Sequence, residues 1–252
     1  MKHVLSPANL DVLAQYAWAR VLLAFDFDGT LAPIVPRRDD ARMRVRTRDL
    51  LAGLCARYPC AVISGRSEAD VEARLNGVGV PHIIGNHGME PGDSLARFEA
   101  EVAAIRPLLM RALAHEPGID IEDKRFSLAL HYRKSRRRMQ AQACIRAAVT
   151  GLPHPVRAIP GKWVVNLVPA NAPNKGDALR ALRAQLGLDA AVFVGDDETD
   201  EDVFALDEPG RLLTIRVGLS HKSAAAYFVK DQREVDPLLA ALVRFRPPEQ
   251  AT

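Results

Sequence analysis

Short runs of consecutive apolar residues recur in the first and last thirds of the chain, and amphipathic stretches separate them. The apolar runs predict short strands at 21–25, 60–63, 82–84, 191–194, 212–217 and 226–229. The amphipathic stretches predict helices at 7–18, 44–57, 174–186, 201–206 and 235–244, and a further helix that ends at Leu75. Strands without polar alternation are typical of parallel sheets covered on both faces. These parts of the chain are therefore predicted to form one parallel α/β domain.

The first helix carries a local start signal. Ser6 precedes Pro7, and a serine N-cap followed by proline at the first helical position is a favoured combination. We therefore expect the helix to begin at Pro7 and to bury the face that carries Leu10, Leu13 and Ala17.

The middle of the chain has a different pattern. It predicts helices at 98–114 and 135–149 and extended stretches at 119–122, 126–132, 155–159 and 162–168. This order is typical of a small α+β unit with an antiparallel sheet. The stretch 169–173 has the composition of a linker. The organisation predicted is a core formed by 1–89 and 173–252, interrupted by an inserted domain at 90–172.

Composition narrows the class of protein. Of the 252 residues, 48% are hydrophobic and 26% are charged, which suits a globular domain with a sizeable core. The sequence has no charge-free apolar stretch of the ~18 residues that a membrane helix needs. The three cysteines have no metal-binding spacing, and no leader-like segment opens the sequence, so we expect reduced thiols in a cytoplasmic protein.

The overall charge gives no reason to expect a nucleic-acid partner. The 34 basic and 31 acidic residues leave a net charge of +3. The basic run 133–138 has almost no interleaved aromatic residues, so a solvated helix face explains it better than a nucleic-acid surface. An anionic ligand would have to be bound by a local cluster of residues.

Acidic clusters follow two of the predicted strands. Asp26 and Asp28 come directly after 21–25, and the run Asp196, Asp197, Glu198, Thr199, Asp200 follows 191–194. Carboxylates this close repel one another unless a cation lies between them, and an all-oxygen ligand set favours Mg²⁺. Each cluster alone is equally compatible with a turn or a helix cap. Two clusters at two strand ends favour a metal site.

Two further residues suit an oxyanion ligand. Lys175 opens a predicted helix, where an ammonium group binds a phosphoryl oxygen well. Ser64 ends a predicted strand and offers a hydroxyl beside backbone N–H groups. Taken singly, Lys175 is better explained as a surface lysine, and Ser64 would be an unremarkable turn serine.

The order of these pieces resembles the four motifs of the haloacid-dehalogenase superfamily of phosphohydrolases. The resemblance implies a Rossmann-like core with an inserted α+β cap domain. It also implies Asp26 as nucleophile, Asp28 as general acid and base, and Lys175 and Ser64 as ligands of the phosphate. Mg²⁺ would be held by Asp26, the Asp28 carbonyl and Asp196, with Asp197 and Asp200 as direct or outer ligands.

Longer strings resemble trehalose-6-phosphate phosphatases within that superfamily. They are FDFDGTLAPI at 25–34, SGRS at 64–67, GNHG at 85–88, IEDK at 121–124, SLALHYR at 127–133, PGKWVV at 160–165 and GDDETDED at 195–202. The resemblance implies a sugar-phosphate substrate and coupling to a trehalose-phosphate synthase. It also implies substrate-binding roles for Gly65, Arg66, Asn86, His87, Glu122, Lys124, Arg133, Lys162 and Asn166.

One position departs from the family pattern. Asn166 stands where the family usually has glutamate. An amide both donates and accepts hydrogen bonds, whereas a carboxylate only accepts. The departure keeps alternatives open: a phosphatase of the same fold for sucrose phosphate or mannosyl-phosphoglycerate, and a catalytically silent sugar-phosphate sensor.

Overall fold

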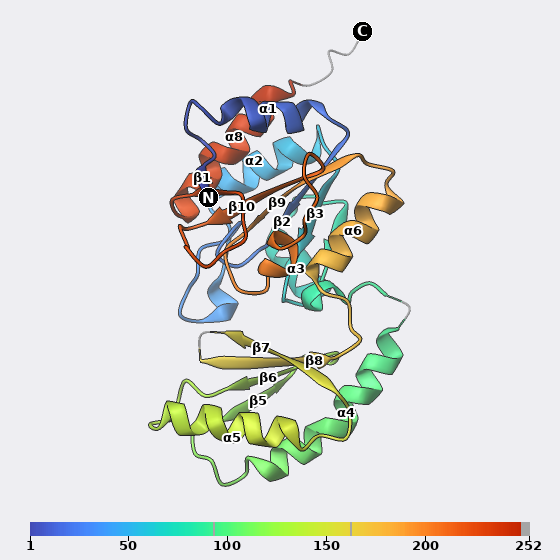
Figure 1. The fold of residues 1–252 in the computed structure, drawn as a ribbon, viewed down its shortest axis with the longest axis vertical. Coiled ribbons are helices and arrows are strands. Elements are labelled where there is room, and N and C mark those ends of the chain that lie inside the picture. Colours follow the sequence, from blue (N-terminus) through green and yellow to red (C-terminus); the bar gives the residue numbers. More distant parts are fainter. Residues whose placement is uncertain (93, 162, 248–252) are drawn as a thin grey trace. The chain divides into compact units, whose positions relative to one another are not determined.

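The computed structural model describes residues 1–92, 94–161 and 163–247. The chain divides into two compact units (Figure 1). Unit 1 consists of Met1–Gly88 and the chain from Pro173 onward, and unit 2 consists of Met89–Ala172. No helix within the described residues combines the length and apolarity needed to cross a membrane.

Unit 1 is built on a parallel sheet with the strand order β1-β11-β10-β9-β2-β3-β4. Its strands are β1 (Lys2–His3), β2 (Val21–Phe25), β3 (Cys60–Ile63), β4 (His82–Ile84), β9 (Ala190–Gly195), β10 (Leu212–Val217) and β11 (Tyr227–Val229). Every neighbouring pair is parallel, which confirms the predicted sheet type. The sequence pattern gives no sign of β1, because two residues carry no detectable periodicity.

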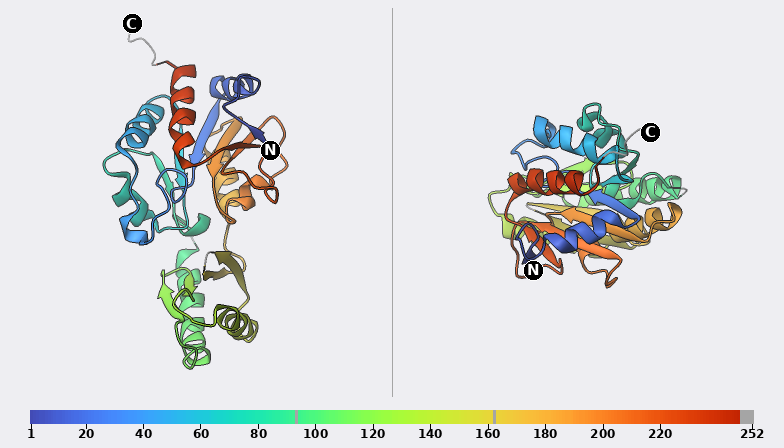
Figure 2. Two further views of the ribbon diagram at one scale, coloured as in Figure 1. Left: turned by 90° about the vertical axis from the view of Figure 1, so that its left-hand side faces the viewer. Right: turned by 90° about the horizontal axis from the view of Figure 1, so that it is seen from above.

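Helices cover both faces of this sheet, as the two views in Figure 2 show. The helices of unit 1 are α1 (Leu10–Trp18), α2 (Val45–Cys55), α3 (Glu68–Leu75), α6 (Lys175–Gln185), α7 (Glu201–Phe204) and α8 (Val235–Phe245). Short 3₁₀ turns lie at η1 (Arg38–Asp40), η2 (Asn86–Gly88) and η3 (Gln232–Glu234).

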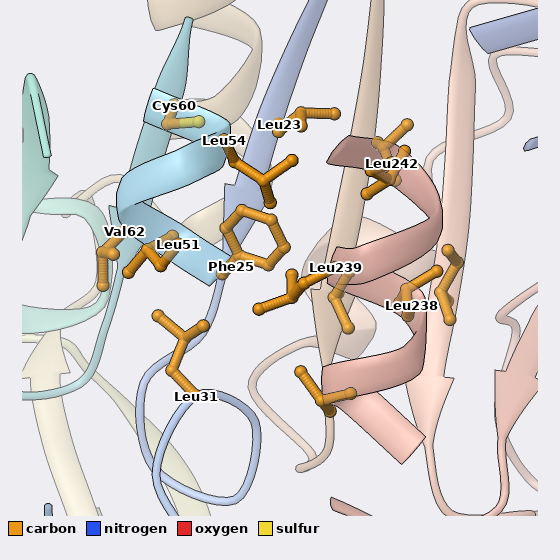
Figure 3. Packing of buried hydrophobic residues seen from close by; sticks show 14 of the residues in the cluster. Leu23, Phe25, Leu31, Leu51, Leu54, Cys60, Val62, Leu238, Leu239 and Leu242 are labelled. Carbon is orange, nitrogen blue, oxygen red and sulfur yellow. The ribbon is translucent and has the colours of Figure 1, made fainter. Parts of the chain in front are cut away.

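Alternate residues of β2 enter two different cores. Leu23 and Phe25 pack with residues of α1, α2 and α8, part of which Figure 3 shows. Leu22 and Ala24 pack with residues of α6 and α7. A central strand with two buried faces has no polar position, which explains the continuous apolar run at 21–25.

The predicted start of the first helix is wrong. The α-helix begins at Leu10, after Asn9, and the serine and proline at positions 6 and 7 lie in preceding turns. The Asn9 amide nitrogen donates to the His3 carbonyl (2.9 Å) and to the Ser6 hydroxyl (2.8 Å). These contacts hold residues 3–9 in a turn after β1. The turn prevents the helix from starting at the Ser6-Pro7 pair.

Unit 2 has a four-stranded antiparallel sheet with the order β5-β6-β8-β7. Its elements are α4 (Leu95–Ala112), β5 (Asp120–Asp123), β6 (Leu128–His131), α5 (Arg138–Thr150), β7 (Val156–Gly161) and β8 (Val164–Pro169). Leu128, Leu130, Val165 and Leu167 pack with residues of α4 and α5 in one core. The α+β class is as predicted, and the helices begin three residues away from the predicted positions, α4 earlier and α5 later.

Candidate active site

Three neighbouring strands of unit 1 end at the candidate site. In the sheet, β2 lies between β9 and β3. Asp26 follows β2, Ser64 follows β3, and Asp196 follows β9. The Asp26 amide donates to the Val194 carbonyl (2.9 Å), so the register of β2 against β9 places these two strand ends together. Ligands of open parallel sheets bind beyond such carboxyl ends.

A buried lysine joins two of the carboxylates. The Lys175 Nζ donates to Asp26 Oδ1 at 2.8 Å and to Asp200 Oδ1 at 2.7 Å. Lys175 is 1% exposed, Asp26 4% and Asp200 0%. Burial alone lowers the pKa of Lys175, but the carboxylates of Asp200 and Asp26 outweigh it and hold that pKa well above its usual value. The lysine is therefore a fixed cation, and it contacts one oxygen of each carboxylate.

The carboxylates outnumber this cation. Asp26, Asp196 and Asp200 each offer one oxygen, and these three oxygens lie within 4.8 Å of one another. Burial raises the pKa of Asp26 well above its ordinary value, against the lowering effect of Lys175. Burial and the neighbouring Asp200 and Asp197 carboxylates raise the pKa of Asp196 to about 8. Asp196 Oδ1 is buried and has no hydrogen-bond partner within the described residues. This arrangement has room for a further positive charge.

The loop after β9 is shaped by two of its own carboxylates. Asp200 Oδ2 accepts hydrogen bonds from the backbone amides of Asp196 (2.7 Å) and Asp197 (3.0 Å). Asp197 Oδ1 accepts from the amide and hydroxyl of Thr199, at 2.8 and 2.7 Å. Asp200 thus orients the loop and the lysine, which leaves Asp196 free to face the site.

A glycine makes room for Asp196. Gly29 has φ +84°, and a Cβ at this position would lie 2.1 Å from Asp196 Oδ2. Any larger residue would be strained in the backbone and would displace the carboxylate. The glycine of the Asp28-Gly29-Thr30 turn is thus required by tertiary packing as well as by the turn.

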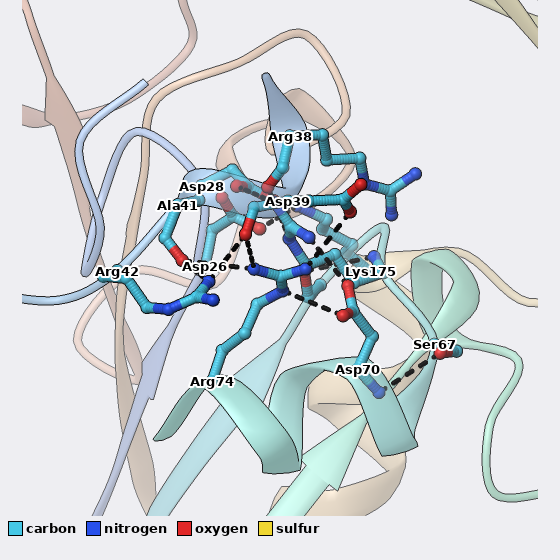
Figure 4. A network of polar contacts seen from close by, with 12 residues as sticks. Asp26, Asp28, Arg38, Asp39, Ala41, Arg42, Ser67, Asp70, Arg74 and Lys175 are labelled. Atoms are coloured by element: carbon cyan, nitrogen blue, oxygen red, sulfur yellow. Dashed lines mark hydrogen bonds and ion pairs between the residues drawn. The ribbon is translucent and has the colours of Figure 1, made fainter. Parts of the chain in front are cut away.

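Asp28 lies in a second polar network, shown in Figure 4. Arg66 Nε donates to Asp28 Oδ2 (2.6 Å), and Arg66 Nη2 donates to Asp28 Oδ1 (2.7 Å). Arg66 Nη1 donates to Asp70 Oδ2 (2.7 Å), and Asp70 Oδ1 accepts from Arg74 Nε (2.8 Å). Sequence reasoning missed Asp70 and Arg74, although the four-residue spacing of 66, 70 and 74 was a usable signal.

The turn after β4 packs against the turn after β3. The Asn86 amide donates to the Arg66 carbonyl (2.7 Å), and the His87 amide donates to the Ser64 carbonyl (2.9 Å). A Cβ on Gly65 would lie 2.5 Å from the His87 ring. Asn86 is 1% exposed, and neither polar atom of its side-chain amide has a hydrogen-bond partner within the described residues. Both Asn86 and His87 have positive φ angles, 47° and 60°, which the close packing of these turns maintains.

The remaining candidate residues belong to unit 2. Glu122, Ala129 and Asn166 are cross-strand partners in one row across β5, β6 and β8, so their side chains share a face of the sheet. The Glu122 carboxylate contacts His131 Nε2 at 2.8 Å, and Lys124 Nζ donates to Asn166 Oδ1 at 3.4 Å. This face is opposite the one that packs on α4 and α5. Arg133 is exposed, and Lys162 lies outside the described residues.

Comparisons with known proteins agree on one family. The family model described as trehalose-phosphatase matches residues 24–233. A rice protein named probable trehalose-phosphate phosphatase 9 is 32% identical over an alignment of 284 positions, and the match covers 96% of this chain and 75% of the rice protein. A trehalose-phosphate phosphatase of Mycobacterium avium is 35% identical over 229 residues, which cover 82% of this chain and 58% of that protein.

Solved structures show the same fold. The C-terminal domain of the Candida albicans trehalose-6-phosphate phosphatase superposes with a TM-score of 0.78 at 23% identity, covering 94% of this chain and 97% of that one. An Aspergillus fumigatus trehalose-6-phosphate phosphatase superposes with a TM-score of 0.68 at 25% identity, covering 97% of this chain and 99% of that one.

Proposed function

Because the chain belongs to the trehalose-phosphatase family, we propose that it hydrolyses trehalose 6-phosphate to trehalose and inorganic phosphate. The observation that carries the proposal is the placement of Asp26 and Asp196 at the ends of neighbouring parallel strands, with Lys175 at the start of α6 bonded to Asp26. The same relatives support a phosphomonoester hydrolase as the class of enzyme.

Asp26 is the nucleophile of the proposal. Lys175 contacts its Oδ1, which leaves Oδ2 to attack phosphorus. Attack forms an aspartyl phosphate and breaks the bond between phosphorus and the sugar oxygen. Splitting the reaction this way replaces one difficult step by two easier ones. The fixed ammonium group of Lys175 also reduces the repulsion between the carboxylate and the phosphate dianion.

Mg²⁺ is the cofactor that we propose, and the oxygen atoms available at the site suit this ion. Asp26 and Asp196 offer carboxylate oxygens, as a hard ion requires, and Asp196 Oδ1 lacks any other partner within the described residues. The Asp28 carbonyl is the third protein ligand that we assign. Asp197 and Asp200 are occupied by loop amides, so we assign them to positioning. When bound, the ion supplies positive charge to the nucleophile and the phosphate together.

Asp28 completes the reaction as general acid and base. It protonates the sugar oxygen as that oxygen leaves, and it then takes a proton from the water that attacks the aspartyl phosphate. Its side chain is 40% exposed, so water reaches it. Ser64 and the side-chain amide of Asn86, which has no hydrogen-bond partner among the residues that the structure describes, supply hydrogen bonds for the phosphate oxygens.

Unit 2 is assigned to recognition of the sugar. Glu122 and Asn166 lie on one face of its sheet, and Lys124 bonds Asn166, so this face presents both donors and acceptors. Sugar hydroxyls need both donors and acceptors. A sugar that leaves a polar group of the binding site without a hydrogen bond is bound less well, so this face can discriminate between sugars. His87, Gly65, Arg133 and Lys162 remain predicted substrate contacts from the family resemblance.

We also assign a cytoplasmic location and supply of the substrate by a trehalose-phosphate synthase. The reaction consumes a product of that class of enzyme. A sugar phosphate is the small-molecule partner that the family supports.

The test is release of inorganic phosphate by the purified protein with Mg²⁺ from trehalose 6-phosphate, sucrose 6-phosphate and glucose 6-phosphate. We expect kcat/KM to be highest for trehalose 6-phosphate by at least about tenfold, a difference of ~1.4 kcal/mol. Preference for another sugar phosphate would retain the mechanism and contradict the substrate.

Asp26→Asn is the control for the chemistry. The amide cannot form the phosphorylated intermediate, so we expect phosphate release to fall by roughly 10⁴-fold or more while the folded structure persists. Turnover retained in Asp26→Asn would contradict the mechanism. Absence of phosphate release from every sugar phosphate by the wild type would favour the silent sensor.

A further inference from the structure

The guanidinium of Arg66 is almost fully committed to protein groups. It donates to both Asp28 oxygens, to Asp70 Oδ2 and, through Nη2, to the Arg38 carbonyl at 2.8 Å. These contacts use four of its five N–H groups. Arg66 is 1% exposed, and the Phe27 ring lies 5.7 Å below its central carbon. A side chain held in this way has little capacity left to bind a substrate.

Asp28, in contrast, keeps capacity for a further partner. An ionised carboxylate has about four lone-pair sites, and the Arg66 fork occupies one on each oxygen. The Asp28 side chain remains 40% exposed while its arginine partner is 1% exposed. The bidentate pair therefore fixes the plane of the carboxylate and leaves one lone pair of each oxygen open to water.

The support behind Arg66 is itself anchored. Asp70 holds both Arg66 and Arg74, and Arg74 donates to the carbonyls of Asp39 (3.0 Å) and Ala41 (3.2 Å). The first turn of α3 and the segment around η1 are thus joined behind Asp28. Such a layered arrangement locks the rotamer of the residue at its front.

We propose that Arg66 is a positioning residue that orients the Asp28 carboxylate for the water-activating step, and that it does not bind the substrate. This inference rests on the proposed phosphatase function. It assigns Arg66 a role different from the one that the family resemblance implies. Asp28 without Arg66 would rotate freely, so its oxygen would seldom face the attacking water.

The test separates the two chemical steps with p-nitrophenyl phosphate. Nitrophenolate leaves without a proton, so the first step needs little help from Asp28, whereas hydrolysis of the aspartyl phosphate still requires it. For Arg66→Gln we expect a burst of nitrophenol stoichiometric with enzyme, followed by a steady rate roughly 10²-fold below wild type. Intact-mass spectrometry of the quenched reaction should show the phosphate adduct, and Asp28→Asn should behave in the same way.

Arg48→Gln is the matched control, since it removes a guanidinium whose carboxylate partner is Asp49 on α2, outside the network around Asp28. We expect no burst and a steady rate within about twofold of wild type. Arg66→Lys keeps the positive charge beside Asp28 and Asp70, so it guards against a folding failure of Arg66→Gln. One ammonium cannot bridge both oxygens, and we expect a burst with partial recovery of the steady rate.

Two results would overturn the inference. One is loss of burst and steady rate together with a large rise in KM, in folded Arg66→Gln and Arg66→Lys, which would make Arg66 a substrate ligand. The other is equal behaviour of the Arg66 and Arg48 variants. Wild-type protein that turns over no phosphate ester would contradict the proposed function instead, so the two failures are distinguishable.

Discussion

At the scale of single residues, burial and partners decide what each charged side chain does. Lys175 and Arg66 are both almost fully buried, and each contacts two carboxylates. Lys175 lies among more carboxylates than it can neutralise, so its surroundings attract a further cation. Arg66 has four of its five N–H donors occupied by protein groups, so its contribution is orientation.

Glu208 shows the same rule away from the site. It contacts Arg180 at 2.8 Å and the buried Arg183 at 2.6 Å, which ties α6 to the loop after α7. Burial by itself raises the pKa of Glu208, but the two guanidiniums outweigh this effect and hold that pKa below its ordinary 4.5. Its stabilising contribution is therefore present above that ordinary value and is lost as the pH falls through the lowered one.

We predict that Glu208→Gln lowers the free energy of unfolding at neutral pH and that this deficit disappears in acid. Urea unfolding at about pH 7 and about pH 3 measures it. Glu72→Gln is the control, because Glu72 is exposed on α3 and has no ion pair within the described residues. A deficit of the same size at both pH values would show that the ion pairs are not its source.

At the scale of elements, the start of α6 places the lysine of the site. Asn174 Oδ1 accepts from the Asp177 amide (2.9 Å), and Asp177 Oδ2 accepts from the Asn174 amide (3.1 Å). This capping box begins the helix at Lys175. A Cβ on Gly176 would lie 2.4 Å from the Asp202 carbonyl, so α6 also packs closely on α7. Capping and packing together direct Lys175 toward the strand ends.

We predict that Asn174→Ala destabilises the protein by about 1 kcal/mol and lowers kcat. Without its cap the first turn of α6 frays, and Lys175 is the first residue of that turn. Thermal unfolding and steady-state kinetics measure the two effects.

Ser94→Ala is the comparison, since Ser94 precedes α4 without a side-chain cap hydrogen bond. We expect almost no change in stability for it. A destabilisation equal to that of Asn174→Ala would contradict the assigned role of the capping box.

At the scale of the whole molecule, folding brings together acidic residues that repel one another in the absence of a cation. The aspartates at positions 26, 196 and 200 come from segments separated by more than half of the chain. A divalent cation that binds only the folded protein stabilises it by mass action. Metal binding should therefore be visible in stability without any turnover.

We predict that saturating Mg²⁺ raises the unfolding temperature of the wild type and that EDTA reverses the rise. At about 100-fold excess over the dissociation constant the expected gain is roughly 2.7 kcal/mol. Asp196→Asn should abolish the rise, whereas Asp207→Asn, an exposed aspartate in the segment after α7, should retain it. A rise that persists in Asp196→Asn would exclude Asp196 as a ligand.

The sequence alone determined the fold class and the approximate positions of most strands. Unbroken apolar runs and helical periodicity depend on local burial, so they predicted the parallel sheet of unit 1 and the α+β class of unit 2. Acidic residues after 21–25 and 191–194 indicated the candidate site, because ligands of parallel sheets bind beyond the carboxyl ends of the strands. The start of α1 and the strand β1 were missed because contacts with residues 226–228 and the turn at 3–9 define them.

Only the tertiary structure decided which side chains meet. Lys175 pairs with Asp26 across 149 positions, and Arg66 pairs with Asp28 across 38. Strand order and register determine such pairs, and neither leaves a local trace in the sequence. The row of Glu122 and Asn166 likewise exists because β6 lies between β5 and β8. Residue types and their local spacing indicate which chemistry is available, and the folded sheet decides which atoms carry it out.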